Sequence, residues 1–182
     1  MPGALLQDAT QLAHAMVQGG ERASVARAVF TCDSFLILMT WRLRCTARRW
    51  HVPGLNHLLR RFQTVFFGIE IGNEVTLGRG IYFVHPVGVV VGGAARVGAR
   101  VRFMGGNTVG TARGDGHPVI EDDVVIGCGA RVLGAVRVGA RAVVGANAVV
   151  LTDVPPDSVA VGVPARVGAP PSGETVRWAH GS

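Results

Sequence analysis

Two histidines stand out because each interrupts an otherwise regular pattern. His85 and His117 are the only histidines between residues 68 and 168. An imidazole changes its charge near neutral pH, so a histidine can take a proton from a substrate and return it. A carboxylate on the other ring nitrogen fixes the tautomer and stabilises the imidazolium that forms. Glu70, fifteen residues before His85, can supply that carboxylate, so His85 is the candidate general base.

The elements that must position these residues follow a period of six. A helix repeats every 3.6 residues and a strand every two, so neither fits. The period is typical of a triangular solenoid, in which three short strands make one coil of about eighteen residues. Glu70 and His85 then stack on neighbouring turns. The inward-facing residues come in three runs: Ile71, Leu77 and Phe83; Val91, Val97, Phe103 and Val109; and Ile120, Ile126, Val132, Val138, Val144 and Val150.

The period breaks twice, and each break holds one histidine. The spacing is eight residues between Phe83 and Val91 and eleven between Val109 and Ile120. Solenoid insertions form loops, often on the binding face, which favours a functional role for both histidines. Plainer interpretations stay open: His85 as a corner residue, His117 as a turn residue before a proline, and Glu70 as a solvated face residue.

Before Gly68 the apolar pattern is helical. Apolar residues at helical spacing fall in residues 5–16, 30–39 and 55–66, with breakers at Gly19-Gly20 and Val52-Pro53-Gly54. We therefore expect a mainly β protein: an α-helical segment at 1–67, a left-handed parallel β-helix at 68–168 and a tail at 169–182.

The helical segment also carries a strip of arginines. We interpret this strip as a solvated helix face, with contact to a membrane surface, a subunit or a ligand as the alternatives. Its members are Arg42, Arg44, Arg48, Arg49, Arg60 and Arg61.

The composition narrows the function classes. The net charge is +6, and all 18 basic residues are arginine. No nucleic-acid motif or stacking aromatic pattern accompanies this charge, so we expect a phosphorylated ligand rather than nucleic acid. Three widely spaced cysteines favour neither a disulfide scaffold nor a zinc site, and they indicate a reducing cytoplasm. Neither a signal peptide nor a membrane-spanning segment is apparent in the sequence.

Four phrases carry a family resemblance. They are Phe67-Gly68-Ile69-Glu70-Ile71, His85-x-x-Gly88-Val89-Val90-Val91-Gly92, Gly116-His117-Pro118-Val119-Ile120 and the closing Val161-Gly162-Val163-Pro164-Ala165-Arg166. With the repeat between them, residues 67–167 resemble the hexapeptide-repeat acyltransferases, and within these the serine acetyltransferase branch. The final phrase is general to the hexapeptide acyltransferases, whereas the second is more particular to the serine acetyltransferase branch and its polysaccharide-cluster relatives.

The resemblance implies an acetyl-CoA-dependent O-acetyltransferase. It assigns His85 as the catalytic base, Glu70 as the acid that orients it and His117 as a second histidine that contacts the substrate. It also implies a homotrimer, or a hexamer, with active sites between subunits, so His85 and His117 of one site can come from different chains. Acetyl-CoA is the co-substrate, without a metal. Its predicted contacts are Gly105, Gly127, Ala146 and Arg166, with Arg131, Arg137 and Arg141 as further candidates for its phosphates.

Oxyanion donors are expected among the backbone N–H groups near Gly88 or Gly105-Gly106, or from the second histidine.

The sequence departs from the family at two positions that matter for the acceptor. Val84 stands where the family has Asp before the base, and Gly116 where it has Arg before the second histidine. In the family these groups hold the two ends of serine, so a sugar, polysaccharide precursor or biosynthetic intermediate is an alternative acceptor. The chain also ends in Gly181-Ser182 rather than Ile, and we expect no complex with cysteine synthase.

Two functions from other classes fit these residues less well. A metal-dependent lyase of the γ-carbonic-anhydrase type shares the fold class but needs three histidine ligands, and the repeat region has two. A non-catalytic scaffold would keep the solenoid and tolerate loss of His85, and the paired histidines at the two breaks argue against it.

Overall fold

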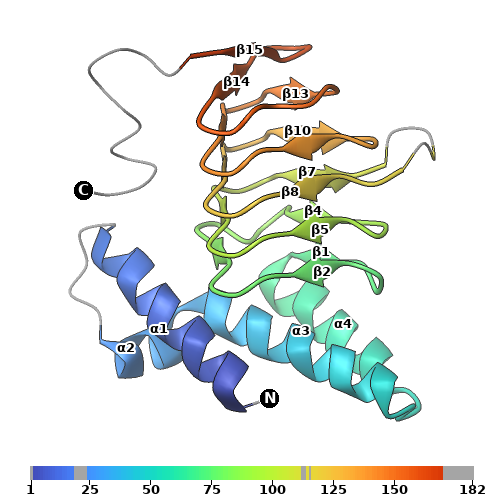
Figure 1. Cartoon of the computed structure of the whole chain (residues 1–182). Coiled ribbons are helices and arrows are strands. Elements are labelled where there is room, and N and C mark those ends of the chain that lie inside the picture. The colour runs from blue at the N-terminus through green and yellow to red at the C-terminus, as the bar shows by residue number, and fades with distance from the viewer. Residues whose placement is uncertain (1, 19–23, 112–113, 115, 170–182) are drawn as a thin grey trace.

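A computed structural model describes residues 2–18, 24–111, 114 and 116–169. Four helices form one end of the molecule, and a column of short strands rises from them (Figure 1). The helices are α1 (Pro2–Gln18), α2 (Val25–Thr31), α3 (Asp33–Arg49) and α4 (Leu55–Phe67). The second expected helical region thus contains two helices, α2 and α3. No helix in the described part of the chain is long and apolar enough to cross a bilayer.

The strands form three sheets that wind as a parallel β-solenoid, which confirms the fold class predicted from the period of six. Sheet A contains β1 (Glu70–Ile71), β4 (Val90–Val91), β7 (Thr108–Gly110), β10 (Arg131–Leu133) and β13 (Val149–Val150). Sheet B contains β2 (Thr76–Leu77), β5 (Arg96–Val97), β8 (Val119–Ile120) and β11 (Arg137–Val138). Sheet C contains β3 (Tyr82–Phe83), β6 (Arg102–Phe103), β9 (Val125–Ile126), β12 (Val143–Val144), β14 (Val159–Val161) and β15 (Arg166–Gly168).

Each coil passes through the sheets in the order A, B, C, so the solenoid has three corners. The A–B and B–C corners lie within a coil, and the C–A corner leads to the next coil. Neighbouring coils pair in parallel, and only β14 with β15 is antiparallel. These corners decide which candidate residues can meet.

The core is built from two inward rows. The periodic residues are buried, as predicted. The residues two positions before them form a second buried row, called here the inner row. Small branched or short side chains suit it because three sheets converge on one narrow axis. Its aliphatic members are Ile69, Val75, Ile81, Val89, Ala95, Val101, Val124, Ala130, Val136, Ala142 and Ala148.

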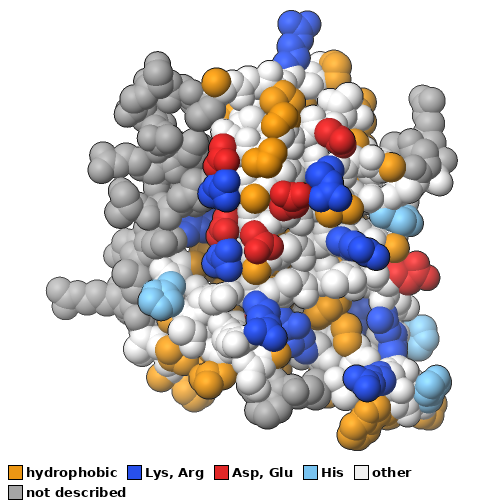
Figure 2. Space-filling model, viewed as in Figure 1, with side chains coloured by type: hydrophobic (Ala, Val, Ile, Leu, Met, Phe, Trp, Pro, Cys, Tyr) orange, Lys and Arg blue, Asp and Glu red, His pale blue; other side chains and the backbone are white. Residues whose placement is uncertain are grey.

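The B–C corner carries a ladder of ion pairs. Arg100, Asp123, Arg141 and Asp157 occupy this corner on successive coils, each with a positive φ between 56° and 60°. Arg100 donates two bonds of 2.6 Å to Asp123, and Arg141 does the same to Asp157. Figure 2 shows acidic and basic side chains alternating along this edge. Paired carboxylates and guanidinium groups thereby support a left-handed turn that glycine usually makes.

The first coil has no coil beneath it, so helix side chains bind its exposed peptide groups. The Ser34 hydroxyl accepts from Phe83 N–H at 2.9 Å and donates to Phe83 C=O at 3.1 Å. Asp8 accepts from Gly80 N–H at 2.9 Å, and Arg42 donates to Gly78 C=O at 2.9 Å. An open edge strand is a liability in a sheet, and these contacts close it.

The arginine strip is not uniformly solvated, which corrects the prediction of a solvated helix face. Arg42 pairs with buried Asp8, and the Nη2 group of Arg44 donates to Ile71 C=O at 3.0 Å and to Asn73 Oδ1 at 2.9 Å. Burial, with the charge of Arg60 nearby, lowers the pKa of Arg44 to about 10. Only the outer members of the strip, Arg48, Arg49 and Arg61, are exposed to solvent. The prediction is wrong for Arg42 and Arg44 because the sequence does not distinguish an arginine that binds a buried partner from one that faces solvent.

Candidate active site

His85 lies at the C–A corner, in the segment that joins β3 to β4. The segment is held at both ends: Val84 N–H donates to Phe103 C=O at 2.9 Å, and Gly88 N–H donates to Gly68 C=O at 2.9 Å. The His85 side chain is exposed. The two extra residues that broke the period thus displace this histidine outward instead of inserting it into the core.

Three of the four residues predicted to contact acetyl-CoA occupy the same corner on higher coils. Gly105, Gly127 and Ala146 follow the sheet C strands β6, β9 and β12 respectively. Arg166 lies on β15, which pairs with Val161 of β14, and it is exposed. The C–A corner therefore brings His85 and the predicted cofactor contacts onto one edge of the solenoid.

Glu70 lies in sheet A beside the C–A corner, in register with Val90. Its carboxylate accepts a bond from Arg60 of α4, and both side chains are partly exposed. The ion pair joins the last helix to the first strand. Among the contacts of the described residues, Glu70 thus pairs with Arg60, and its predicted role in orienting His85 stays a prediction.

His117 lies at the A–B corner, between β7 and β8. Its ring covers Gly93 on the coil below: a Cβ added to Gly93 would stand 2.2 Å from His117 Nδ1. That Nδ1 atom is buried and has no hydrogen-bond partner among the described residues. An unpaired buried N–H is rarer in proteins than an unpaired acceptor. With Nδ1 as an unpaired acceptor, the ring would carry its proton on Nε2 and could donate a hydrogen bond there.

The two histidines lie at opposite edges of sheet A. On the third coil this sheet runs from Gly106, at the C–A corner beside His85, to Gly110, where the A–B loop begins. Four residues of strand span about 13 Å. One chain consequently does not bring His85 and His117 to a shared substrate atom.

The expected backbone oxyanion donors are already engaged, so this expectation is not met. Gly88 N–H donates to Gly68 C=O, Gly106 N–H donates to Val87 C=O at 3.3 Å, and Gly105 N–H donates to Asn107 Oδ1 at 3.0 Å. The pattern of glycines could not reveal this because hydrogen-bond partners depend on the neighbouring coil. Of the donors considered, His117 remains.

The arginines considered for the CoA phosphates are also engaged. Arg137 lies in sheet B and donates to Glu121 at 2.6 Å, and Arg141 is part of the B–C ladder. Arg131 lies in sheet A and donates to Gly106 C=O at 2.5 Å. Arg137 and Arg141 lie away from the C–A corner of their own chain, and their role toward the CoA phosphates stays a prediction.

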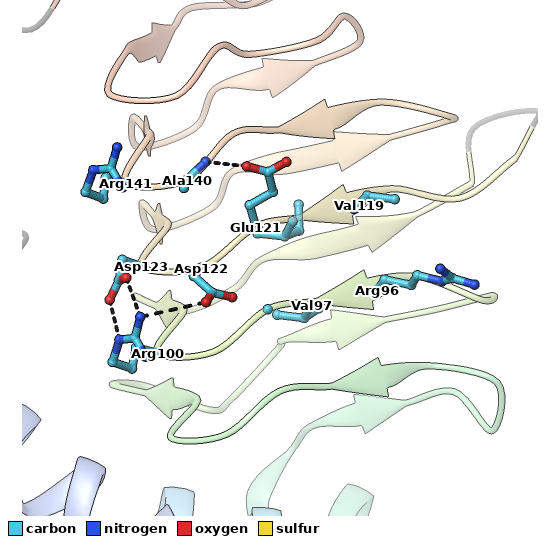
Figure 3. A pocket seen from close by; sticks show the side chains of 11 residues that line it. Arg96, Val97, Arg100, Val119, Glu121, Asp122, Asp123, Ala140 and Arg141 are labelled. Atoms are coloured by element: carbon cyan, nitrogen blue, oxygen red, sulfur yellow. Dashed lines mark hydrogen bonds and ion pairs between the residues drawn. The ribbon is translucent and has the colours of Figure 1, made fainter.

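A groove of about 600 Å³ runs over sheet B beside the ladder. Its acidic residues, Glu121, Asp122 and Asp123, all bind arginines or backbone N–H groups. Figure 3 shows the Arg96 side chain extending along β5, away from this cluster. Because these charges are paired, the groove carries little net charge. Among its arginines in the described residues, Arg96 is the one that makes no ion pair.

Arg96 is a candidate that the sequence analysis missed. Its N–H donates to the carbonyl of Pro118 at 3.0 Å, so it lies beside the residue that follows His117. Strand geometry puts the Cα atoms of Arg96 and His117 about 8 Å apart. The Arg96 side chain is exposed and has no ion pair among the described residues. The break after Val109 could have signalled it, since β5 is the strand beneath that loop.

No group of three His, Cys, Asp or Glu side chains suited to hold a metal ion occurs among the described residues.

Comparison with known proteins agrees with this arrangement. Residues 117–152 match the bacterial transferase hexapeptide (six repeats) family. Serine acetyltransferase of Helicobacter pylori strain J99 is 44% identical over 132 residues, which cover 71% of this chain and 77% of the relative. The structure of soybean serine acetyltransferase complexed with serine has a TM-score of 0.80 at 33% identity, covering 91% of this chain and 70% of the other. A serine acetyltransferase in complex with CoA also has a TM-score of 0.80, at 29% identity, covering 91% and 68%.

Other curated relatives are longer. The matched region spans 63% of the serine acetyltransferase of Synechococcus elongatus and 54% of that of Bacillus subtilis. The match to the Helicobacter relative nevertheless covers most of both chains, and the solenoid carries the motif histidines at its two breaks. The chain therefore belongs to the serine acetyltransferase family of hexapeptide-repeat transferases.

Proposed function

We propose that this protein is an acetyl-CoA-dependent O-acetyltransferase in which His85 is the general base. The observation that carries the proposal is the placement of His85 at the foot of the C–A corner, below Gly105, Gly127 and Ala146. A thioester lying along this corner would present its carbonyl beside an exposed imidazole. The family relationship and the CoA complex of a similar protein support the same assignment.

The chemistry is a direct transfer. His85 takes the hydroxyl proton as the acceptor oxygen attacks the thioester carbonyl, and the carbonyl electrons move onto oxygen. The tetrahedral intermediate then collapses, the C–S bond breaks, and the imidazolium returns the proton to the departing sulfur. A general base typically contributes about 10² to 10⁴ in rate.

The site requires two chains. Sheet A, whose strand spans about 13 Å on the third coil, lies between His85 and His117, so a complete site joins the C–A corner of one chain to the A–B corner of its neighbour. Closed cyclic symmetry provides this contact repeatedly, and we propose a homotrimer. His117 of the neighbour, protonated on Nε2, would then donate to the oxyanion. A cytoplasmic location and the lack of a cysteine synthase complex stay predictions.

Serine is the acceptor that the relatives favour, and Arg96 supports it. An exposed guanidinium beside His117 can bind the carboxylate of an amino acid. Val84 and Gly116 favour the second candidate, a neutral hydroxyl on a sugar or intermediate. Gly116 has a φ of 115°, and a Cβ there would stand 2.8 Å from Ala135 Cβ, so this position does not accept a side chain without strain.

Release of free CoA thiol tests the proposal. The purified protein is assayed with acetyl-CoA and serine, homoserine, serinol or sugars as acceptor. His85→Ala should lower kcat by about 10² to 10⁴, whereas the exposed His14 of α1 serves as the control, and His14→Ala should leave kcat unchanged. Full turnover by His85→Ala would refute the assigned base.

A second experiment distinguishes serine from a neutral hydroxyl acceptor. Arg96→Met should raise KM for serine about tenfold while leaving KM for serinol, which lacks the carboxylate, within about twofold, as expected for loss of one charge-assisted bond. Arg61→Met, on the helical segment, is the matched control. Saturation by a sugar but not by serine would favour the second candidate.

A further inference from the structure

Asn107 occupies a position of the inner row where the other coils carry aliphatic side chains. It lies two residues before Val109, as Val101 lies before Phe103 and Ala130 before Val132, and it is completely buried. Burying an amide is unfavourable unless its hydrogen bonds are made. The aliphatic members of the row indicate that the coil itself does not need a polar group there. We propose that Asn107 is a positioning residue for His85.

Both ends of the Asn107 amide are bound. Oδ1 accepts from Gly105 N–H at 3.0 Å, and Nδ2 donates to the carbonyl of Gly127 on the next coil at 2.6 Å. The side chain thus links the turn after β6 to the coil above. A valine of similar size could fill the space but could make neither bond.

The turn that Asn107 holds has every backbone polar group engaged. Gly105 N–H is bound by Asn107, and Gly105 C=O accepts from Gly129 N–H at 2.8 Å. Gly106 N–H donates to Val87 C=O, two residues after His85, and Gly106 C=O accepts from Arg131. Satisfied networks of this kind make a rigid local structure. The Gly105-Gly106 turn therefore forms a fixed surface at the C–A corner.

His85 packs against that surface from the coil below. A Cβ added to Gly105 would stand 3.0 Å from His85 Cβ and 3.1 Å from the His85 carbonyl oxygen. Gly105 also has a φ of 132°, which disfavours any other residue. From below, Ser34 binds both peptide groups of Phe83, two residues before His85. The histidine backbone is thus held between α3 and the Gly105-Gly106 turn.

The position of the His85 ring limits the rate of proton transfer. A general base has to stand within hydrogen-bond reach of the proton it takes, and a misplacement of about 1 Å can cost about 10² in rate. Without Asn107 the Gly105 N–H loses its acceptor, and the surface against which His85 packs loosens. This inference rests on the proposed function.

The experiment compares Asn107→Val with Ala130→Val, an aliphatic change in the same row one coil higher. Asn107→Val should fold and assemble as the wild type does and lower kcat about 10- to 100-fold, with KM for acetyl-CoA within about twofold. Ala130→Val should keep kcat. Full kcat in Asn107→Val would overturn the proposal, and so would failure of this variant to fold, because the row predicts that valine fits.

A double variant tests whether Asn107 acts through His85. In the His85→Ala background, Asn107→Val should lower the residual rate less than about twofold, because the base it positions is gone. An undiminished loss in that background would contradict the proposal. Histidine side-chain NMR provides a readout without activity: the His85 signals should shift in Asn107→Val and stay in place in Ala130→Val. Inactivity of the wild type would refute the proposed function, whereas unchanged His85 signals would refute the positioning role.

Discussion

Mixed trimers of two impaired variants, His85→Ala and His117→Ala, should regain activity. The fraction regained follows from which corner of each chain contributes to a site. His85→Ala destroys the C–A half of each site and leaves the A–B half intact. His117→Ala does the opposite. Alone, the two variants should lose about 10² to 10⁴ and about 10² to 10³ in kcat, as expected for a base and for one oxyanion donor.

In a trimer assembled from equal amounts of both variants, each interface joins the C–A corner of one chain to the A–B corner of the next. The interface is complete only when the first chain carries His117→Ala and the second carries His85→Ala. Random assembly meets this condition at roughly a quarter of the interfaces in a closed ring. The mixture should therefore show roughly a quarter of wild-type kcat, far above either parent.

Co-expression with two affinity tags isolates the mixed trimers. Each of these has one complete interface out of three, so CoA thiol release from the isolated trimers should reach roughly a third of wild-type kcat. Co-expression of His85→Ala with His85→Asn is the control and should recover nothing. Activity equal to the mean of the two parents would refute the two-chain site, because it would mean that both histidines serve within one chain despite the width of sheet A.

Three further outcomes are expected. Cys128 is the exposed cysteine and lies at the C–A corner, so a maleimide should label it first, and CoA should slow the labelling measured by mass spectrometry. Asp8→Ala should remove the carboxylate partner of Arg42, leave it only the Gly78 carbonyl, and lower the free energy of unfolding by about 3 to 5 kcal/mol. Urea denaturation measures this loss, which should shrink when the same change is made in an Arg42→Ala background. Gly116→Ala should cost about 1 to 3 kcal/mol because of its positive φ and contact with Ala135, and a midpoint equal to the wild type would contradict that strain.

The solenoid was predictable from sequence because its determinants are local. An inward-facing apolar residue recurs every six positions along each coil. Val91, Val97 and Phe103 therefore indicate the course of the backbone from local spacing alone. The two breaks were equally visible, since an insertion changes the spacing wherever it occurs. The spacing alone therefore places both histidines on loops.

The partners of the charged residues were not predictable in this way. Arg44 and Arg48 have the same type and spacing as a solvated strip, yet one binds the first coil and the other faces solvent. Glu70 likewise pairs with Arg60 from α4 rather than with a residue of its own repeat. Such choices depend on how the helices dock beneath the solenoid, which the periodicity does not describe.

The sequence by itself determined the coil, its two breaks and the chemistry that an imidazole at a break can perform, because those depend on residue type and spacing along the chain. Only the tertiary structure decided that His85 and His117 stand at different corners of sheet A, that the glycine N–H groups are already bound, and that Asn107 replaces an aliphatic residue on the coil above the base. These depend on which coil lies above and below each residue, and stacking of coils is a relation between segments distant in sequence.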